Sequence, residues 1–201
     1  ARLFSDQARQ SWLDLQSQPA QATPQQIHQY LDILENASNA VSVLYGTPLT
    51  ERRFLIHFSQ RAQAAGRPGM AAGLADLIQD DPASLELIQN LLENWRLALQ
   101  SAGNREEKSP RLDPARLPYY ERAVLALGED SPAAALWLLL RTWTRAARAQ
   151  PDDAAVLSGW QNACGRLGLS SAALPERLKA VDAYLDTVEE TLDLWGKQYG
   201  V

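Results

Sequence analysis

The 201-residue sequence contains one cysteine, Cys164, and only two histidines, His28 and His57. A single cysteine excludes an internal disulfide and a zinc site built from cysteine ligands. The two histidines fall on different expected helices and therefore do not form a cluster of metal ligands. We expect no metal site and no cofactor, and the scarcity of cysteine favours a reducing compartment, the cytoplasm.

Long apolar runs and an excess of positive charge are also missing. The longest strongly apolar run, residues 133–140, has eight residues, whereas a membrane-spanning helix needs roughly 20. We expect this run in a core, and no membrane partner. The formal net charge is -5 and the sequence pI is about 5.1. No broad positive potential would then hold DNA nonspecifically, so any contact with nucleic acid must be local.

The sequence also lacks the signatures of common catalytic sites. It has no Gly-x-Ser-x-Gly pattern and no glycine-rich loop followed by Lys and Ser or Thr, which excludes the usual serine hydrolase and phosphate-loop arrangements. Asp80 with Asp81, and Asp152 with Asp153, are neighbours in sequence and would point about 100° apart on a helix. We expect these pairs to cap helices rather than to act as catalytic dyads.

Helix signals recur along the chain, and alternating β-branched runs are absent. The pattern predicts an all-α bundle of about eight to nine helices. The clearest helix start is Thr23, followed by Pro24 at the first helical position and by Gln26 in a capping-box position. We expect the first helix to begin with Ser5 as its N-cap, and the third to run over residues 47–66.

Residues 104–116 are charged, contain two prolines and lack helical periodicity. Such a segment is typical of a linker or a seam between helical units. It divides the chain into an N-terminal helical part, residues 1–103, and a C-terminal helical part, residues 117–201. The two parts either form separate subdomains or pack as one domain.

The last expected helix carries apolar residues at alternating spacings of three and four, the pattern of a heptad seam. Leu185, Val188 and Leu192 lie at the centre of this seam. Two interpretations are open. The seam either packs inside the bundle or pairs two chains in a homodimer.

The helix expected over residues 132–149 carries an aromatic and three guanidinium groups on one face, at spacings of four, four and three. This face consists of Trp137, Arg141, Arg145 and Arg148. It suits a phosphate-bearing ligand, with Tyr119 or Tyr120 of the preceding helix closing the pocket. Alternatively, the arginines oppose the helix dipole and pair with acids of the last helix. Those acids are Asp182, Asp186 and Glu189.

The stretch "TERRFLIHF", from Thr50 to Phe58, contains Arg52 and His57 at a spacing of five. This spacing resembles the motif of HEPN domains, helical nucleotide-binding modules of which some are RNases. The resemblance implies that His57 acts in acid-base chemistry on a ribose 2′-hydroxyl and that Arg52 stabilises phosphate charge. On a continuous helix, however, the two residues would lie some 140° apart. They are otherwise ordinary residues of a helix surface.

A longer succession of segments includes "YGTPLTERRFLIHF", "GRPGMAAGL" and "YYERAVLALGEDSPAAALWLLLRTWT", and it ends with a long acidic helix. Over residues 40–199 it resembles the helical C-terminal region attached to some bacterial nucleotidyltransferase-type domains. The resemblance implies a non-catalytic accessory module that binds a partner protein or positions a substrate for a catalytic domain, and a chain that belongs to something longer. The alternative is a nucleotide- or RNA-binding HEPN-like domain, with RNA cleavage as its enzymatic form.

Overall fold

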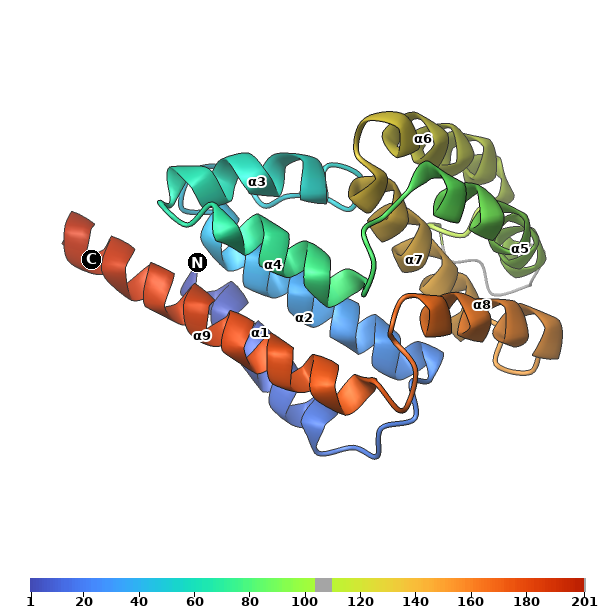
Figure 1. Cartoon of the computed structure of the whole chain (residues 1–201), viewed down its shortest axis with the longest axis horizontal. Helices are drawn as coiled ribbons and strands as arrows, with labels where there is room; N and C mark the ends of the chain where they lie inside the picture. Colours follow the sequence, from blue (N-terminus) through green and yellow to red (C-terminus); the bar gives the residue numbers. More distant parts are fainter. Residues whose placement is uncertain (104–109, 201) are drawn as a thin grey trace.

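Figure 1 shows α-helices packed side by side and joined by short connections. The computed structural model describes residues 1–103 and 110–200, and these ranges hold nine α-helices, one short 3-10 helix and no strand. The prediction of an all-α bundle is therefore confirmed. The helices are α1 (Arg2–Gln16), α2 (Pro24–Ser42), α3 (Phe54–Ala64), α4 (Gly69–Ile78), α5 (Leu85–Gly103), η1 (Pro114–Arg116), α6 (Leu117–Asp130), α7 (Pro132–Arg148), α8 (Ala154–Arg166) and α9 (Leu174–Tyr199).

Helix α7 occupies the middle of the bundle. It packs against α5, α6 and α8 and also against α2 and α3. Every residue from 134 to 144 is buried, which explains why the sequence places its longest apolar run there. Because α7 contacts α2 and α3 as well as α5, α6 and α8, side chains on its polar face meet residues from distant parts of the chain.

Helix α9 lies along α1, α2 and α4, and its C-terminal end extends past the bundle (Figure 1). Leu185 and Val188 are fully buried and Leu192 nearly so. These side chains are therefore covered by other helices of the same chain. The centre of the α9 heptad seam therefore packs within the bundle, whereas Tyr199 at the end of the helix is 55% exposed. Pairing of two chains through this seam stays a prediction.

Helices on either side of the predicted linker, residues 104–116, pack against one another. Helix α5, from the N-terminal part, packs on α6, α7 and α8, whereas α9, from the C-terminal part, packs on α1, α2 and α4. Residues 104–109 of the predicted linker lie outside the described residues. Beyond them, Asp113 caps η1 by accepting a hydrogen bond from the Ala115 N–H at 2.9 Å.

Helix α3 begins at Phe54, seven residues later than Thr47, where the sequence placed its start. The cause is a tertiary contact with α2. Asn39 Oδ1 accepts a hydrogen bond from the Leu49 N–H at 2.7 Å, and Asn39 Nδ2 donates to the Leu49 carbonyl at 3.3 Å. Because the Asn39 carboxamide takes both backbone groups of Leu49, the chain stays in a non-helical turn until after Arg53.

Two predicted helix caps are confirmed by the contacts of their side chains. Thr23 Oγ1 accepts a hydrogen bond from the Gln26 N–H at 3.2 Å, and Asp153 Oδ1 accepts one from the Val156 N–H at 3.1 Å. The Gln26 side chain accepts from the N–H of Gln21, so it anchors the loop before α2 and not the cap itself.

Two other predicted caps are wrong. Helix α1 already begins at Arg2, and Ser5 is a buried residue in its second turn. The side-chain cap of α5 comes from Ser84, whose Oγ accepts a hydrogen bond from the Leu87 N–H at 3.1 Å. The expected cap Asp80 instead binds Arg177 of α9. A tertiary ion pair has thus taken the place of a local cap.

Candidate anion-binding pocket

The predicted arginine face of α7 meets acidic residues of α2 and of the turn before α3. Arg141 Nη1 donates to Asp32 Oδ1 at 2.6 Å, and its Nη2 donates to Glu35 Oε2 at 2.7 Å. Arg145 Nη2 donates to Glu51 Oε1 at 2.9 Å. The Arg141 and Arg145 side chains are only 7% and 12% exposed, so these are largely buried ion pairs between distant segments.

The expected pairing of the α7 arginines with acids of the last helix is wrong. Arg9 of α1 takes all three of those carboxylates through hydrogen bonds. They are Asp182, Asp186 and Glu189. The reason lies in the packing, because α9 contacts α1, α2 and α4, whereas the polar face of α7 is turned toward α2.

Trp137 lies in the core and not on a ligand-accessible surface. Its side chain is fully buried, its ring stacks on Phe54 with the centroids 4.6 Å apart, and the Arg141 guanidinium carbon lies 5.6 Å from the ring centroid. Trp137 therefore stabilises the Arg141 guanidinium by a cation-π contact. The predicted aromatic wall of a ligand pocket is absent at this position.

Arg148, the last residue of α7, differs from the two arginines before it. Within the described ranges its guanidinium has no hydrogen bond and no ion pair. Partial burial lowers the pKa of Arg148 below its usual value; nearby Asp32 opposes this effect, and the charges of Arg145 and Arg141 add to it. Arg145 Nη1 is also buried without a hydrogen-bond partner in the described residues. Two guanidiniums thus keep donors free at the end of α7.

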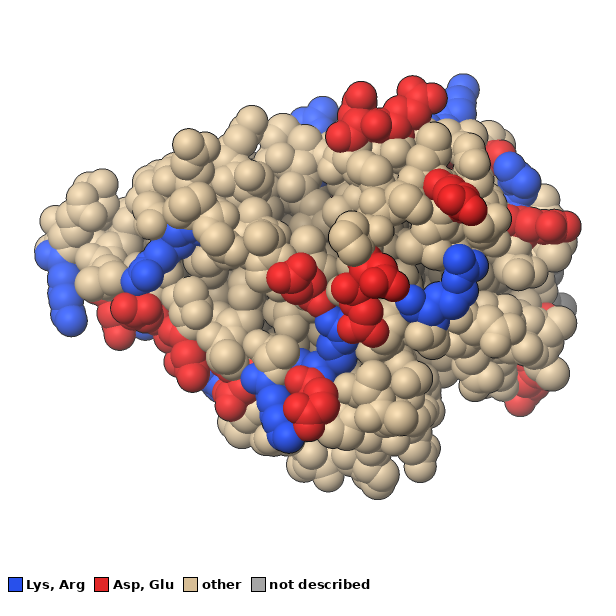
Figure 2. All heavy atoms as spheres, viewed as in Figure 1, with Lys and Arg blue, Asp and Glu red and all other residues tan. Residues whose placement is uncertain are grey.

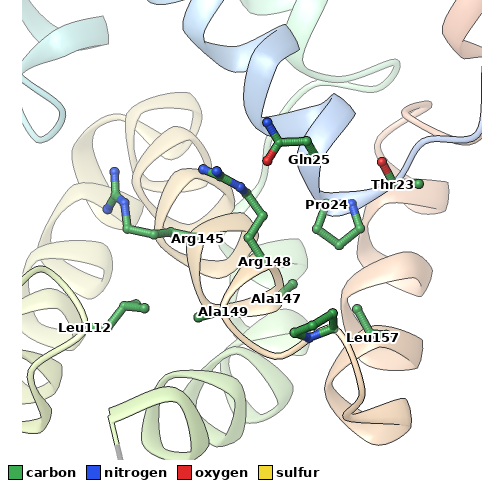
Figure 3. A pocket seen from close by; sticks show the side chains of 10 residues that line it. Thr23, Pro24, Gln25, Leu112, Arg145, Ala147, Arg148, Ala149 and Leu157 are labelled. Atoms are coloured by element: carbon green, nitrogen blue, oxygen red, sulfur yellow. The ribbon is translucent and has the colours of Figure 1, made fainter. Parts of the chain in front are cut away.

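A hollow of about 560 Å³ lies beside these donors, between the end of α7, the start of α2 and α8 (Figure 3). Figure 3 shows the Arg148 side chain extending toward Gln25 at the start of α2, with Leu112 and Leu157 lower in the view, at its left and right. The hollow therefore has a polar side and an apolar side. Its lining consists of Thr23, Pro24, Gln25, Leu112, Arg145, Ala147, Arg148, Ala149, Pro151 and Leu157.

The start of α2 adds to the positive potential on the polar side. Backbone amides at a helix N-terminus carry partial positive charge and favour anions. The first turn of α2 contains no acidic residue that would neutralise this charge. An anionic group at the polar side would therefore meet Arg145, Arg148 and the α2 N-terminus together.

His28 on α2 lies close to this cluster, although it was not among the residues predicted to form a site. Its Nε2 is 3.5 Å from Asp32 Oδ2, and its Nδ1 is buried without a hydrogen-bond partner in the described part of the chain. Burial lowers the pKa of His28 to about 4, with Asp32 opposing the change and the α7 arginines adding to it. His28 is therefore neutral at neutral pH, so the arginines carry the positive charge of the site.

Tyr119 and Tyr120 do not close the pocket beside Arg145 and Arg148. Together with Arg52, Glu35 and other residues they line a separate hollow of about 320 Å³. Tyr119 accepts a hydrogen bond from Arg52 Nη1 at 2.9 Å, and Tyr120 is buried. The predicted combination of tyrosines with the α7 arginines is therefore not formed.

Arg52 and His57 line one hollow of about 500 Å³ between α3 and α6. The separation of 140° expected on a continuous helix does not apply, because α3 begins only at Phe54 and Arg52 lies in the turn before it. Tyr119 holds the Arg52 guanidinium at the edge of this hollow through a hydrogen bond and a ring contact. The two residues are thus brought to the same surface.

Among the described residues, no group of three or more His, Cys, Asp or Glu side chains is arranged to hold a metal ion. None of the helices described is both long enough and apolar enough to cross a membrane. Comparison of the chain with protein-family models, curated proteins and solved structures gives no match. The resemblances to HEPN domains and to nucleotidyltransferase-attached helical regions therefore stay predictions.

Proposed function

We propose that the protein is a non-catalytic helical module that binds an organic anion in the pocket between α2, α7 and α8. Arg148 and Arg145 would hold the carboxylate or phosphate of the ligand, and Leu112 and Leu157 would contact its apolar part. The observation that carries this proposal is the free guanidinium of Arg148, which lines a hollow of about 560 Å³ without a partner in the described residues.

Three arginines that are more shielded from solvent than Arg148 provide a comparison. Arg9, Arg141 and Arg177 are largely shielded from solvent, and each donates to one or more carboxylates. Arg148 is exposed and has no carboxylate partner among the described residues, so its guanidinium can form a charge-assisted, bidentate hydrogen bond to an oxyanion. Arg148 is positioned to form this kind of bond with a ligand.

The shape and lining of the pocket narrow the class of anion. A volume of about 560 Å³ lies within the roughly 300–1,000 Å³ typical of small-molecule sites. The lining contains leucine, proline and alanine but no aromatic side chain, so it offers no surface on which a nucleobase would stack. We therefore propose an aliphatic carboxylate or phosphate monoester as the ligand, in preference to a nucleotide.

A binding assay on three variants tests the proposal. Octanoate, octyl phosphate, inorganic phosphate and AMP are titrated into the wild type by calorimetry at low salt. We expect octyl phosphate to bind best, Arg148→Ala to weaken it at least about tenfold, which is about 1.4 kcal/mol, and added salt to weaken it further. Leu157→Ala should weaken octyl phosphate but leave inorganic phosphate unchanged.

Arg166→Ala is the matched control, because Arg166 is an exposed arginine at the end of the neighbouring helix α8. This variant loses the same charge and should bind as the wild type does. Equal loss of affinity in the two arginine variants would show that only the overall charge matters. Failure of all four anions to bind the wild type would reject the proposed function.

A second candidate function is supported by the position of Arg52 and His57 on one hollow. It is the RNA cleavage implied by the resemblance to HEPN domains, with His57 in the acid-base role. Single-stranded RNA is incubated without metal with the wild type and with His57→Ala. Cleavage by the wild type alone would support this function, whereas equal cleavage by both proteins, or by neither, would reject it.

A further inference from the structure

A second hollow, of about 410 Å³, has the opposite electrostatic character. It lies between the C-terminal end of α4 and the N-terminal end of α7 and shares no lining residue with the anion pocket. Asp76, Asp80 and Asp81 all line it. Figure 2 shows acidic side chains gathered near the middle of the face drawn, where α4 ends in Figure 1.

Arg177 of α9 neutralises this cluster only in part. It donates to the Asp80 carboxylate and to the backbone carbonyl of Asp76. The side chains of Asp76 and Asp81 are exposed and form no ion pair with any described residue. Three carboxylates therefore face one guanidinium, and the C-terminal end of α4 adds partial negative charge.

Gln79 provides a separate sign that this hollow lacks a hydrogen-bond donor. It is only 8% exposed and lines the hollow, and its Oε1 accepts no hydrogen bond from the described residues. Buried carbonyl oxygens in folded proteins almost always have a donor. A ligand with several N–H groups would satisfy Gln79 Oε1 and compensate Asp76 and Asp81 at the same time.

We propose that this hollow binds an organic cation, the ammonium or guanidinium group of a Lys or Arg side chain on a partner protein or of a free polyamine. A bare metal ion fits less well, because the described residues include no ligand group suited to one. The small side chains Ala72, Ala75 and Pro132 leave room for the alkyl part of such a cation. The inference does not depend on the anion pocket.

The test is an NMR titration of isotope-labelled protein with spermidine and, separately, with a short arginine- and lysine-rich peptide. We expect both to shift the side-chain amide signals of Gln79 and the backbone amides of Ser131 and Ala133. The double variant Asp76→Asn, Asp81→Asn should lose at least tenfold in affinity. Asp6→Asn, Glu93→Gln changes the net charge equally at exposed positions elsewhere and should lose less than twofold.

Gln79→Leu separates a ligand role from a structural one. If Gln79 is there for a ligand, removing its unpaired oxygen leaves the melting temperature of the free protein unchanged or raises it, while cation affinity falls. A lower melting temperature with undiminished cation affinity would overturn the inference. So would equal losses in the two double variants, or no shift at Gln79 with either probe.

The two probes also distinguish the sources of the cation. Shifts with the peptide alone would support a basic segment of a partner protein as the natural occupant. Shifts with both probes would support a site that also accepts free polyamines. Shifts with spermidine alone would support the free amine.

Discussion

Two clusters of ion pairs connect helices of this bundle, and they differ in the sign of the charge that is in excess. At the first cluster, Arg9 of α1 alone serves three carboxylates of α9. Those carboxylates are Asp182, Asp186 and Glu189. Hydrogen bonds from Arg9 to Glu189 first, and also to Asp186 and Asp182, raise the pKa of Arg9 above its usual value. The excess charge there is negative.

At the second cluster, two of the three arginines of α7, Arg141 and Arg145, pair with acids of α2 and of the turn before α3. The acids are Asp32, Glu35 and Glu51. Arg111 also approaches Glu51, at 3.9 Å, so the excess charge is positive and it falls on Arg148. The Arg9 acids are 39–71% exposed, so water compensates their excess. Arg148 is exposed as well, and its excess charge borders a partly apolar hollow. The paired charges connect helices, whereas the unpaired charge beside the hollow is the basis of the proposed ligand site.

The largest expected difference between the clusters is in stability. Arg141→Ala removes the cation from Glu35, which is only 23% exposed, and we expect the free energy of unfolding to fall by about 3 kcal/mol. Arg9→Ala leaves its acids in contact with water and should cost about 1 kcal/mol or less. Urea denaturation of both variants measures the difference. Equal losses would mean that burial does not distinguish the clusters.

Much of the fold was predictable because its signals are local. The apolar run of α7, the seam of α9 and the caps Thr23 and Asp153 depend on neighbouring residues, and each is found where the sequence placed it. The late start of α3 was not predictable, since it depends on the contact of Asn39 with Leu49 across two segments. Here a tertiary contact overrides the local preference of the sequence for a helix.

The second expected difference is in the response to pH, because only the α7 cluster includes a histidine. The unfolded chain protonates His28 near pH 6.5, but the folded chain does so only near pH 4. The free energy of unfolding should therefore be highest above pH 6.5, fall as the pH drops from 6.5 to 4, and stop falling below that. Each pKa unit corresponds to about 1.4 kcal/mol.

Glu35 acts in the opposite sense, which reduces the net effect. Burial raises the pKa of its carboxyl group, so protonation stabilises the folded chain as the pH falls. We expect a net loss smaller than the roughly 3 kcal/mol that the His28 shift alone would give between pH 7 and pH 4. His28→Gln should remove most of this slope in urea denaturation series at several pH values. The charged groups that act on His28 are Asp32, Arg141, Arg145 and Arg148. An unchanged slope in the variant would assign the effect to the carboxyl groups alone.

Only the part of the candidate site that lies on a single helix was predictable. Spacing along α7 placed Arg141, Arg145 and Arg148 on one face. Arg145 and Arg148 line the hollow, whereas Arg141 pairs with Asp32 and Glu35 and does not line it. Spacing on one helix does not tell which helix faces it, so the acids of α9 were paired with the wrong arginines. His28, Asp32 and Glu35 are spaced by four and three residues and therefore share one face of α2. Which residues that face meets depends on how α2 packs against α7.

The smallest expected effect on the free energy of unfolding is that of Arg148→Ala, and it tests whether the charge of Arg148 is unpaired. Arg148→Ala removes no hydrogen bond or ion pair with the described residues, so the free energy of unfolding should change by no more than about 0.5 kcal/mol. Its matched partner is Arg145→Ala, which leaves Glu51, only 16% exposed, without its closest cation. That variant should lose about 2 kcal/mol, because an unpaired carboxylate then stays largely buried. Urea denaturation without ligand compares the two. If Arg148→Ala destabilises the chain as much as Arg145→Ala does, Arg148 belongs to the structural ion pairs, and the distinction between the two clusters fails at the pocket itself.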